Sequence, residues 1–359
     1  MNIVLTAILT AVQNLQRLNH FVITLISILW LTNTAFAAQP LPLDLQSAAL
    51  AAIDLIYQEQ FKKAEEEARF IIKKYPEHPA GYFFMAVVLD SWAAVYQSNK
   101  KVDEFYRYCD LAIEKGENLL AKDSKNQWAK FFIAGADGYK GTFEARYEKW
   151  ITAFRYGWKG VSLFLEMEKE GCTIADINYG IGSYDYWRSA LIKILWFMSK
   201  VDDKRQRAIN RLYYAQENGL FTRTSSSAAL VDILINESRY SEALDIAERL
   251  LLKYPGSIIF NWGKARALFG LERYEESMKV FRALLSKVES DPHDNHYTAS
   301  LCHLWMAKIE MKLGNYSQAI TECNRVGYYD FEEGIRKRLE KQFSEAADIR
   351  KAATQMMKK

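Results

Sequence analysis

Two segments of the sequence repeat each other at a spacing of 34 residues. Residues 239–251, RYSEALDIAERLL, align with residues 273–285, RYEESMKVFRALL. Each segment has an aromatic residue, a small residue three positions later and a pair of leucines at its end. A small side chain lets two antiparallel helices approach closely, and the aromatic ring fills the groove at their turn. The period and the pattern together predict a helix–turn–helix unit that recurs along the chain.

The same pattern occurs in two further parts of the sequence. A repeat at 45–78 has Phe61 at the aromatic position and Ala64 at the small one, and a hairpin at about 300–327 has Tyr316 and Ala319 there. Nowhere does an alternation of polar and apolar residues persist, so we predict an all-α protein. The repeats resemble those of tetratricopeptide repeat (TPR) proteins. The resemblance implies a solenoid of helical hairpins with a concave face.

The composition changes along the chain and divides it into five expected parts. The middle part is rich in aromatic residues and glycine, and Gly135, Gly138 and Gly141 recur there every third residue, which permits close helix packing. The last part has apolar residues on one face of a single long helix and charge on the other, as the end of a solenoid requires. The parts are a signal peptide at 1–37, N-terminal hairpins at 38–126, the divergent aromatic and glycine-rich helical section at 127–223, regular repeats at 224–327 and a capping helix at 328–359.

Three consecutive segments carry a second resemblance. They are residues 179–198, YGIGSYDYWRSALIKILWFM, residues 203–219, DKRQRAINRLYYAQENG, and residues 239–255, RYSEALDIAERLLLKYP. In this order they resemble the tetratricopeptide repeat protein 39 and inclusion-body clearance family, over about residues 125–290. That resemblance implies a helical repeat scaffold and no activity. Just upstream of the first segment, Thr173 and Asp176 predict a capping box at the start of its helix.

The N-terminus has the composition of an export signal. Residues 1–37 contain no acidic residue, and residues 21–31 form an apolar run of eleven, shorter than the roughly 20 residues that span a bilayer. Ala35 and Ala37 stand at the small positions that signal peptidase requires. We therefore predict cleavage before Ala38 and export, with the bacterial periplasm as the expected compartment. A retained anchor is the alternative, and peripheral association with a membrane stays open.

Charge and motifs argue against several functional classes. The 47 basic and 44 acidic residues are finely interspersed, whereas a nucleic-acid binder concentrates its basic residues. No nucleophile–base motif is visible, so we predict no enzyme and no cofactor. Four residues have metal-ligating chemistry, but Pro292 favours a polar loop over a zinc site. They are His293, Asp294, His296 and His303. Cys302 and Cys323 fall about one helical turn out of register, so we expect core thiols.

Two candidate sites follow from this architecture. The first helix of each repeat lines the concave face of such an array, where a partner protein can dock. We expect its contacts at Asp232, Asn236, Asn261, Lys264, His303 and Lys308. The alternative is a carrier of an apolar small molecule or lipid in a central aromatic cleft. Its lining would be Tyr139, Tyr147, Trp150, Tyr184, Tyr186 and Trp187, although a core is the more ordinary use of these residues.

Overall fold

The computed structural model describes residues 40–194 and 202–358. Over these two ranges the chain forms sixteen α-helices and no strand, so the predicted all-α fold is confirmed. The export signal predicted at 1–37 lies outside the described residues. Among the helices described, none combines the length and the apolar character that a membrane span needs.

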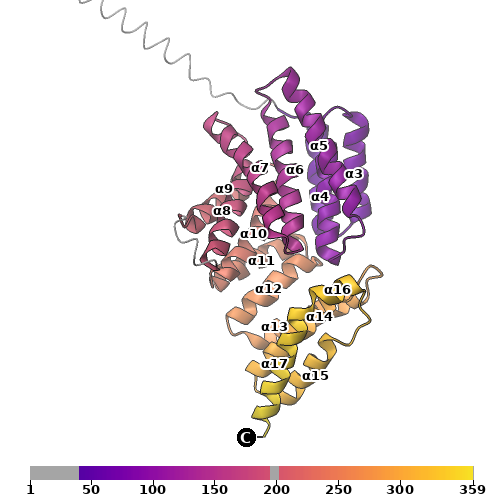
Figure 1. The fold of residues 1–359 in the computed structure, drawn as a ribbon, viewed down its shortest axis with the longest axis vertical. Helices are drawn as coiled ribbons and strands as arrows, with labels where there is room; N and C mark the ends of the chain where they lie inside the picture. Colours follow the sequence, from indigo (N-terminus) through magenta and orange to yellow (C-terminus); the bar gives the residue numbers. More distant parts are fainter. Residues whose placement is uncertain (1–39, 195–201, 359) are drawn as a thin grey trace, which may run out of the picture.

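The helices pair into antiparallel hairpins that stack in chain order (Figure 1). The hairpins are α2 (Leu43–Tyr57) with α3 (Phe61–Lys74), α4 (Pro79–Tyr96) with α5 (Val102–Lys122), α6 (Gln127–Arg146) with α7 (Trp150–Lys169), α8 (Ile177–Ile194) with α9 (Arg205–Asn218), α10 (Arg223–Asn236) with α11 (Tyr240–Lys253), α12 (Ile258–Gly270) with α13 (Tyr274–Glu289), and α14 (Tyr297–Lys312) with α15 (Tyr316–Val326). Each helix packs mainly on its neighbours in the sequence. The protein is therefore a helical-hairpin solenoid.

One turn geometry connects the helices of five hairpins. Glu59, Glu148, Ser238, Glu272 and Gly314 all have a left-handed backbone, with φ between 57° and 78°. The next residue in each turn donates its N–H to a carbonyl five positions back, which closes the end of the first helix. Glu148 belongs to hairpin α6–α7, inside the divergent section. That section therefore keeps the turn of the regular repeats although its sequence does not.

The helices of hairpin α6–α7 approach each other at glycines. A side-chain carbon at Gly141 would lie 2.9 Å from the carbonyl oxygen of Ala153, and one at Gly160 would lie 2.5 Å from that of Ala134. No other residue fits at such a backbone contact. The predicted close packing is confirmed at Gly141.

The solenoid turns back on itself, so that its first hairpin rests on α11, α12 and α13 (Figure 1). The Tyr254 hydroxyl donates to Asp54 over 2.5 Å, and the Ile258 N–H donates to Glu59 over 2.6 Å. The Lys287 ammonium pairs with the same Glu59 carboxylate. These polar contacts join segments about 200 residues apart in the sequence.

The second hairpin makes a matching set of contacts one step further along the chain. The Tyr96 hydroxyl donates to Asp291 over 3.2 Å, and the Asn295 amide donates to the Tyr96 carbonyl over 2.8 Å. The Arg338 guanidinium donates to the Gln97 carbonyl over 2.8 Å. Successive hairpins of the N-terminal half therefore dock on successive elements of the C-terminal half, which closes the superhelix.

Aromatic side chains fill the space that this closure encloses. Phe221, which follows α9, packs its ring 5.1 Å from Phe84 of α4 and 5.7 Å from Trp128 of α6. Tyr139 of α6 lies 5.7 Å from Phe83. Fourteen of the 18 residues of α4 are buried. The inner face of the N-terminal half is therefore occupied by the chain itself.

Asp176 fixes the loop after α9 rather than the start of α8. Its buried carboxylate accepts hydrogen bonds from the N–H groups of Leu220, Phe221 and Thr222 at 2.7–2.9 Å. Helix α8 begins at Ile177, after Asp176, so the capping box predicted from Thr173 and Asp176 is wrong. A buried carboxylate needs several donors in place of water, and the loop supplies them.

The C-terminal cap is two helices instead of the one that was predicted. Helix α16 (Glu333–Arg338) and helix α17 (Glu340–Met356) meet at Leu339, which is fully buried. Phe331, Ile335 and Leu339 share one cluster against Tyr297 and Leu301 of α14. The Arg338 bond to Gln97 holds α16 across the closure, so it cannot continue in line with α17.

Stability is expected to fall in acid because of His78, which precedes α4 and accepts the Ala80 N–H at Nδ1 over 3.2 Å. Burial lowers the pKa of His78 from 6.5 to about 4. Because the unfolded chain binds this proton more readily, its contribution to stability is complete above pH 6.5 and is lost as the pH falls toward 4. In urea unfolding, the free energy of unfolding should be about 2 kcal/mol lower at pH 5 than at pH 7. The His78→Asn protein, which keeps a capping oxygen, should not show this difference. Equal losses in both proteins would contradict this assignment.

Opening of the closure is expected from Glu59→Lys. The substitution places a second ammonium beside Lys287 and removes the acceptor of the Ile258 N–H. We expect the free energy of unfolding to fall by about 2–3 kcal/mol and the radius of gyration in small-angle X-ray scattering to increase. Glu66→Lys, on the exposed side of α3, is the matched control and should change neither quantity. An unchanged scattering curve for Glu59→Lys would show that the aromatic interior alone holds the closure.

Candidate functional site

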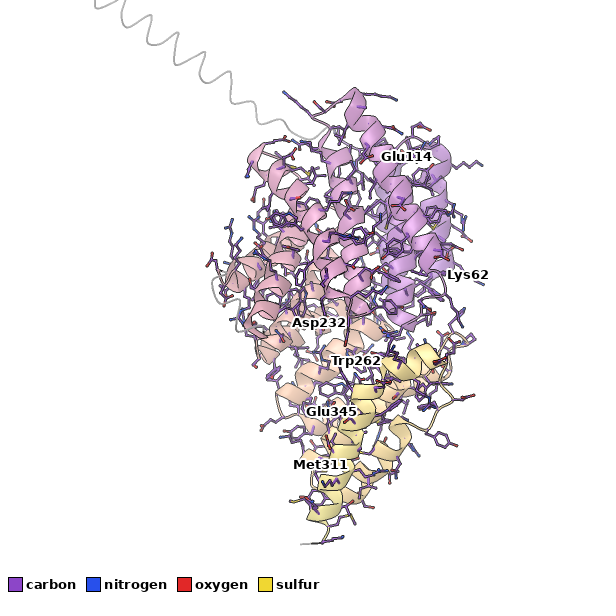
Figure 2. All side chains as sticks on the ribbon, in the orientation of Figure 1. Lys62, Glu114, Asp232, Trp262, Met311 and Glu345 are labelled. Atoms are coloured by element: carbon purple, nitrogen blue, oxygen red, sulfur yellow. The ribbon has the colours of Figure 1, made fainter. Side chains whose placement is uncertain are left out.

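A row of charged side chains runs along the first helices of the C-terminal hairpins. Asp232 of α10, Arg266 of α12 and Lys308 of α14 are 34 and 42 residues apart, which is the spacing of the repeats themselves. Arg266 pairs with Asp232 over 2.8 Å, and Lys308 pairs with Glu345 of α17 over 2.8 Å. We call these four residues the charged row. Figure 2 shows Asp232 and Glu345 one above the other, between the middle of the molecule and its C-terminal end.

Aromatic rings lie beside the charged row. Trp262 of α12 and Trp305 of α14 both contact the Phe281 ring, with centroids 5.4 Å and 5.7 Å away. The Lys308 ammonium lies 4.5 Å from the centroid of the Trp305 ring, a favourable cation–π geometry. Neither tryptophan is fully buried. The row therefore offers charge together with accessible apolar surface.

Asp232 lies close to other groups and is still accessible to the solvent. Burial raises its pKa, while the neighbouring Arg266 opposes that shift. Yet 51% of its side chain remains accessible. The Asp232 carboxylate can therefore be reached from the solvent while it is paired with Arg266.

The pairs in the charged row are weak enough to be exchanged. Each joins two partly exposed side chains, and such pairs typically contribute about 0–1 kcal/mol. A partner that brings its own charges can replace one member of a pair at little loss of stability. These pairs therefore contribute little to the stability of the fold.

Sequence analysis missed Arg266, although a signal for it was present. Arg266 stands 34 residues after Asp232 with the opposite charge. Opposite charges at equivalent positions of adjacent repeats predict an ion pair between their first helices. Comparing repeats position by position would have found it.

Three of the other predicted contact residues are hydrogen-bonded within the chain. Asn236 donates to the Tyr186 hydroxyl over 2.7 Å, and Asn261 donates to the Ser257 carbonyl over 2.9 Å. His303 is buried, with Nδ1 bonded to Glu322 and Nε2 within 2.9 Å of the Tyr329 hydroxyl. His303 has no ring nitrogen free for a partner, so its placement on an accessible face is corrected.

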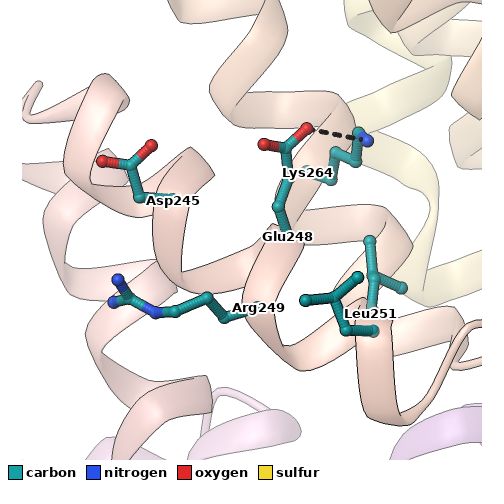
Figure 3. A pocket seen from close by; sticks show the side chains of 6 residues that line it. Asp245, Glu248, Arg249, Leu251 and Lys264 are labelled. Carbon is teal, nitrogen blue, oxygen red and sulfur yellow. Dashed lines mark ion pairs between the residues drawn. The ribbon is translucent and has the colours of Figure 1, made fainter.

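Lys264 lines a different surface. It pairs with Glu248 of α11 over 2.9 Å, whereas Arg266, two residues later, faces α10. Lys264 borders an open hollow of about 560 Å³ between α11 and α12 (Figure 3). The hollow is lined by Asp245, Glu248, Arg249, Leu251, Leu252 and Lys264. The predicted set of six residues is therefore divided between two sides of the first helices.

The predicted aromatic cleft is divided among four places. Tyr139 packs in the interior against Phe83. Tyr147 lies under the Arg338 guanidinium, 4.8 Å from its ring centroid, at the closure. Tyr186 is buried and donates to Glu237 over 2.8 Å. The remaining three, Trp150, Tyr184 and Trp187, belong to the outer side of α7 and α8. One continuous cleft does not form.

The histidines and cysteines have separate structural partners. His293 bonds Asp291 and His296 bonds Asp294, each over 3.1 Å within its own loop. Among residues 40–194 and 202–358, no group of three or more His, Cys, Asp or Glu is arranged to hold a metal ion. Cys302 and Cys323 are unbonded and buried, and burial raises the pKa of Cys323 to about 11. Such thiols are core-filling and unreactive.

A family model matches the part of the chain that holds Asp232 and Arg266 of the charged row. Residues 229–295, which include Asp232 and Arg266, match the family model described as tetratricopeptide repeat. No curated protein sequence matches the chain. The resemblance to the tetratricopeptide repeat protein 39 and inclusion-body clearance family is not among these findings and stays a prediction.

Three solved structures are similar to the chain at low sequence identity. A tetratricopeptide repeat protein from Parabacteroides merdae ATCC 43184 is 12% identical, with a TM-score of 0.39 over 85% of this chain and 100% of that one. The TPR domain of P58(IPK) is 14% identical, with a TM-score of 0.28 over 86% and 99%. The APC/C hetero-tetramer Cut9–Hcn1 is 9% identical, with a TM-score of 0.26 over 85% and 71%. Scores this low carry no inference about the function of this chain.

Proposed function

Since this chain is a tetratricopeptide repeat protein, and such arrays generally bind other proteins along their concave surface, we propose that it is a non-catalytic scaffold. Its partner would be a protein segment that docks along the charged row. The observation that carries the proposal is the position of this row on three consecutive first helices. The corresponding inner face of the N-terminal half is filled by the chain's own aromatic residues.

The geometry favours a partner segment that carries both charges. Acidic groups of the partner would replace Glu345 at Lys308 or Asp232 at Arg266, with a basic group compensating Asp232. Complementary charges fix the register of such a segment and speed its association. The accessible rings of Trp262 and Trp305 supply apolar contact. A helical or an extended segment can meet these conditions.

Two further parts of the proposal rest on the sequence. The apolar run at 21–31 and the alanines at 35 and 37 support export with cleavage before Ala38, into the bacterial periplasm. The alternative function, a carrier of an apolar molecule in an aromatic cleft, has less support. Its six aromatic side chains lie in four separate places.

Partner binding is expected to depend on the charged row. We predict that Arg266→Glu with Lys308→Glu weakens partner binding by roughly tenfold or more, because two attractive contacts become repulsive. Native mass spectrometry of the mature protein, purified gently from its own host, measures this as loss of a companion of fixed stoichiometry. Lys62→Glu with Lys279→Glu makes the same charge change on exposed outer positions and should keep the companion.

Each other outcome of this experiment is informative. A companion retained by the Arg266 and Lys308 variant would move the docking face elsewhere. An adduct of small-molecule mass in place of a protein would favour the carrier function. The same spectra test export, because a first residue at Ala38 supports it and an intact Met1 contradicts it.

A further inference from the structure

A second surface of the protein exposes large apolar side chains. Ile151 is 90% exposed, Trp158 54%, and Trp150 and Trp187 43% each. They belong to α7 and α8, which lie on the side of the molecule opposite α3 (Figure 1). Single exposed apolar residues are ordinary, but a group of them marks an interaction surface.

The four side chains belong to one continuous surface. Ile151 and Trp158 are seven residues apart and Trp150 and Trp158 eight, so all three share one face of α7. Trp158 contacts the Tyr184 ring of α8 at 6.2 Å between centroids. Trp187 follows Tyr184 by three residues and so lies on the same side of α8. We call Trp150, Ile151, Trp158 and Trp187 the aromatic patch.

The border of the aromatic patch is positively charged. Residues 149–165 contain no acidic residue, while Lys149, Arg155 and Lys159 are all exposed. Lys149 pairs with Glu144 and Lys159 with Asp137, but both of these carboxylates are buried. The ammonium groups therefore face the solvent and the carboxylates face the core.

On α8, too, the acidic side chain is buried and a basic side chain is accessible. Its one acidic residue within Ile177–Ile194, Asp185, is buried and lies 3.7 Å from Lys204. Arg188, beside Trp187, remains partly exposed. The accessible carboxylates nearest the patch, Glu148 and Asp203, are paired with Lys341 and Arg205, so the basic side chains of α7 and α8 dominate the charge of its border.

We propose that the aromatic patch binds the surface of a bilayer that contains anionic phospholipids. Indole rings favour the headgroup region, where one edge is apolar and the other is wet. Basic side chains bordering an apolar face add attraction to lipid phosphates. Ile151 would enter the acyl boundary, and Arg155 with the two lysines would contact the headgroups. The protein would lie on the membrane and would not cross it.

A lipid surface explains the patch better than a protein partner does. Protein interfaces deplete lysine, whereas residues 149–165 carry basic charges alone, and the carboxylates that pair with Lys149 and Lys159 are buried. The inference is independent of the proposed scaffold function, because the charged row lies on α10, α12, α14 and α17. A protein could be held at the row while the patch rests on the bilayer.

Vesicle binding tests the proposal with the purified protein. We expect co-sedimentation with vesicles of about 30% phosphatidylglycerol in phosphatidylcholine, and little with phosphatidylcholine alone. Tryptophan emission should shift to the blue on binding, and added salt should weaken binding. Arg155→Gln should lower the partition coefficient about fivefold, and Ile151→Glu should lower it about tenfold or more.

Leu252→Glu is the matched control, because Leu252 is 87% exposed on α11, outside the patch. It should bind vesicles like the unaltered protein. The proposal is overturned if anionic vesicles do not bind the protein, if neutral vesicles bind it equally, or if Leu252→Glu reduces binding as much as Ile151→Glu. It is also overturned if light scattering shows a dimer that Ile151→Glu dissociates, since the patch would then join two copies of the chain.

Discussion

The docking of the first hairpin on α11, α12 and α13 determines the rest of the structure. Glu59 accepts a hydrogen bond from the Ile258 N–H and pairs with the Lys287 ammonium, and Asp54 accepts a hydrogen bond from the Tyr254 hydroxyl. These contacts are polar and lie at the rim, while the enclosed space is filled with aromatic rings. The division is physically reasonable, since apolar burial supplies most of the stabilisation and polar bonds fix the relative position. A solenoid without this contact would be an open coil with its inner face free.

The closure makes the two halves of the array differ in how much of their inner face is accessible. In the N-terminal half, α4 is buried on nearly every side, so its hairpins act as a core. In the C-terminal half, the first helices keep side chains such as Asp232 accessible. The hairpins are alike in design, but only part of their inner face remains available to a partner.

The sequence predicted what is local to each hairpin. Repeat spacing, the small residues at Ala64 and Ala243, and the glycine contact at Gly141 all depend on residues within one hairpin or its neighbour. Each of these features depends on a sequence pattern no longer than one repeat of 34 residues. The all-helical fold and the stacking of hairpins follow from these patterns.

The closure and most of the candidate site could not be predicted in this way. Whether Asp54 meets Tyr254 depends on the small rotation that each hairpin adds, summed over four hairpins. No local pattern encodes that sum. A different limit, at the scale of one hairpin, explains why His303 looked accessible and why Asp176 looked like a helix cap. In both cases the deciding partner, Glu322 or the loop at 220–222, comes from another element.

The two proposed surfaces differ in where their carboxylates lie, and this decides what each can bind. In the charged row the carboxylates of Asp232 and Glu345 are accessible, so both charges can be exchanged with a protein segment. At the aromatic patch Asp137 is only 2% exposed beneath Lys159. Because it is buried, the Asp137 carboxylate cannot pair with a group outside the protein. It holds the Lys159 ammonium, which is exposed to the solvent. Similar ion pairs therefore make one surface adaptable to both charges and the other selective for anions.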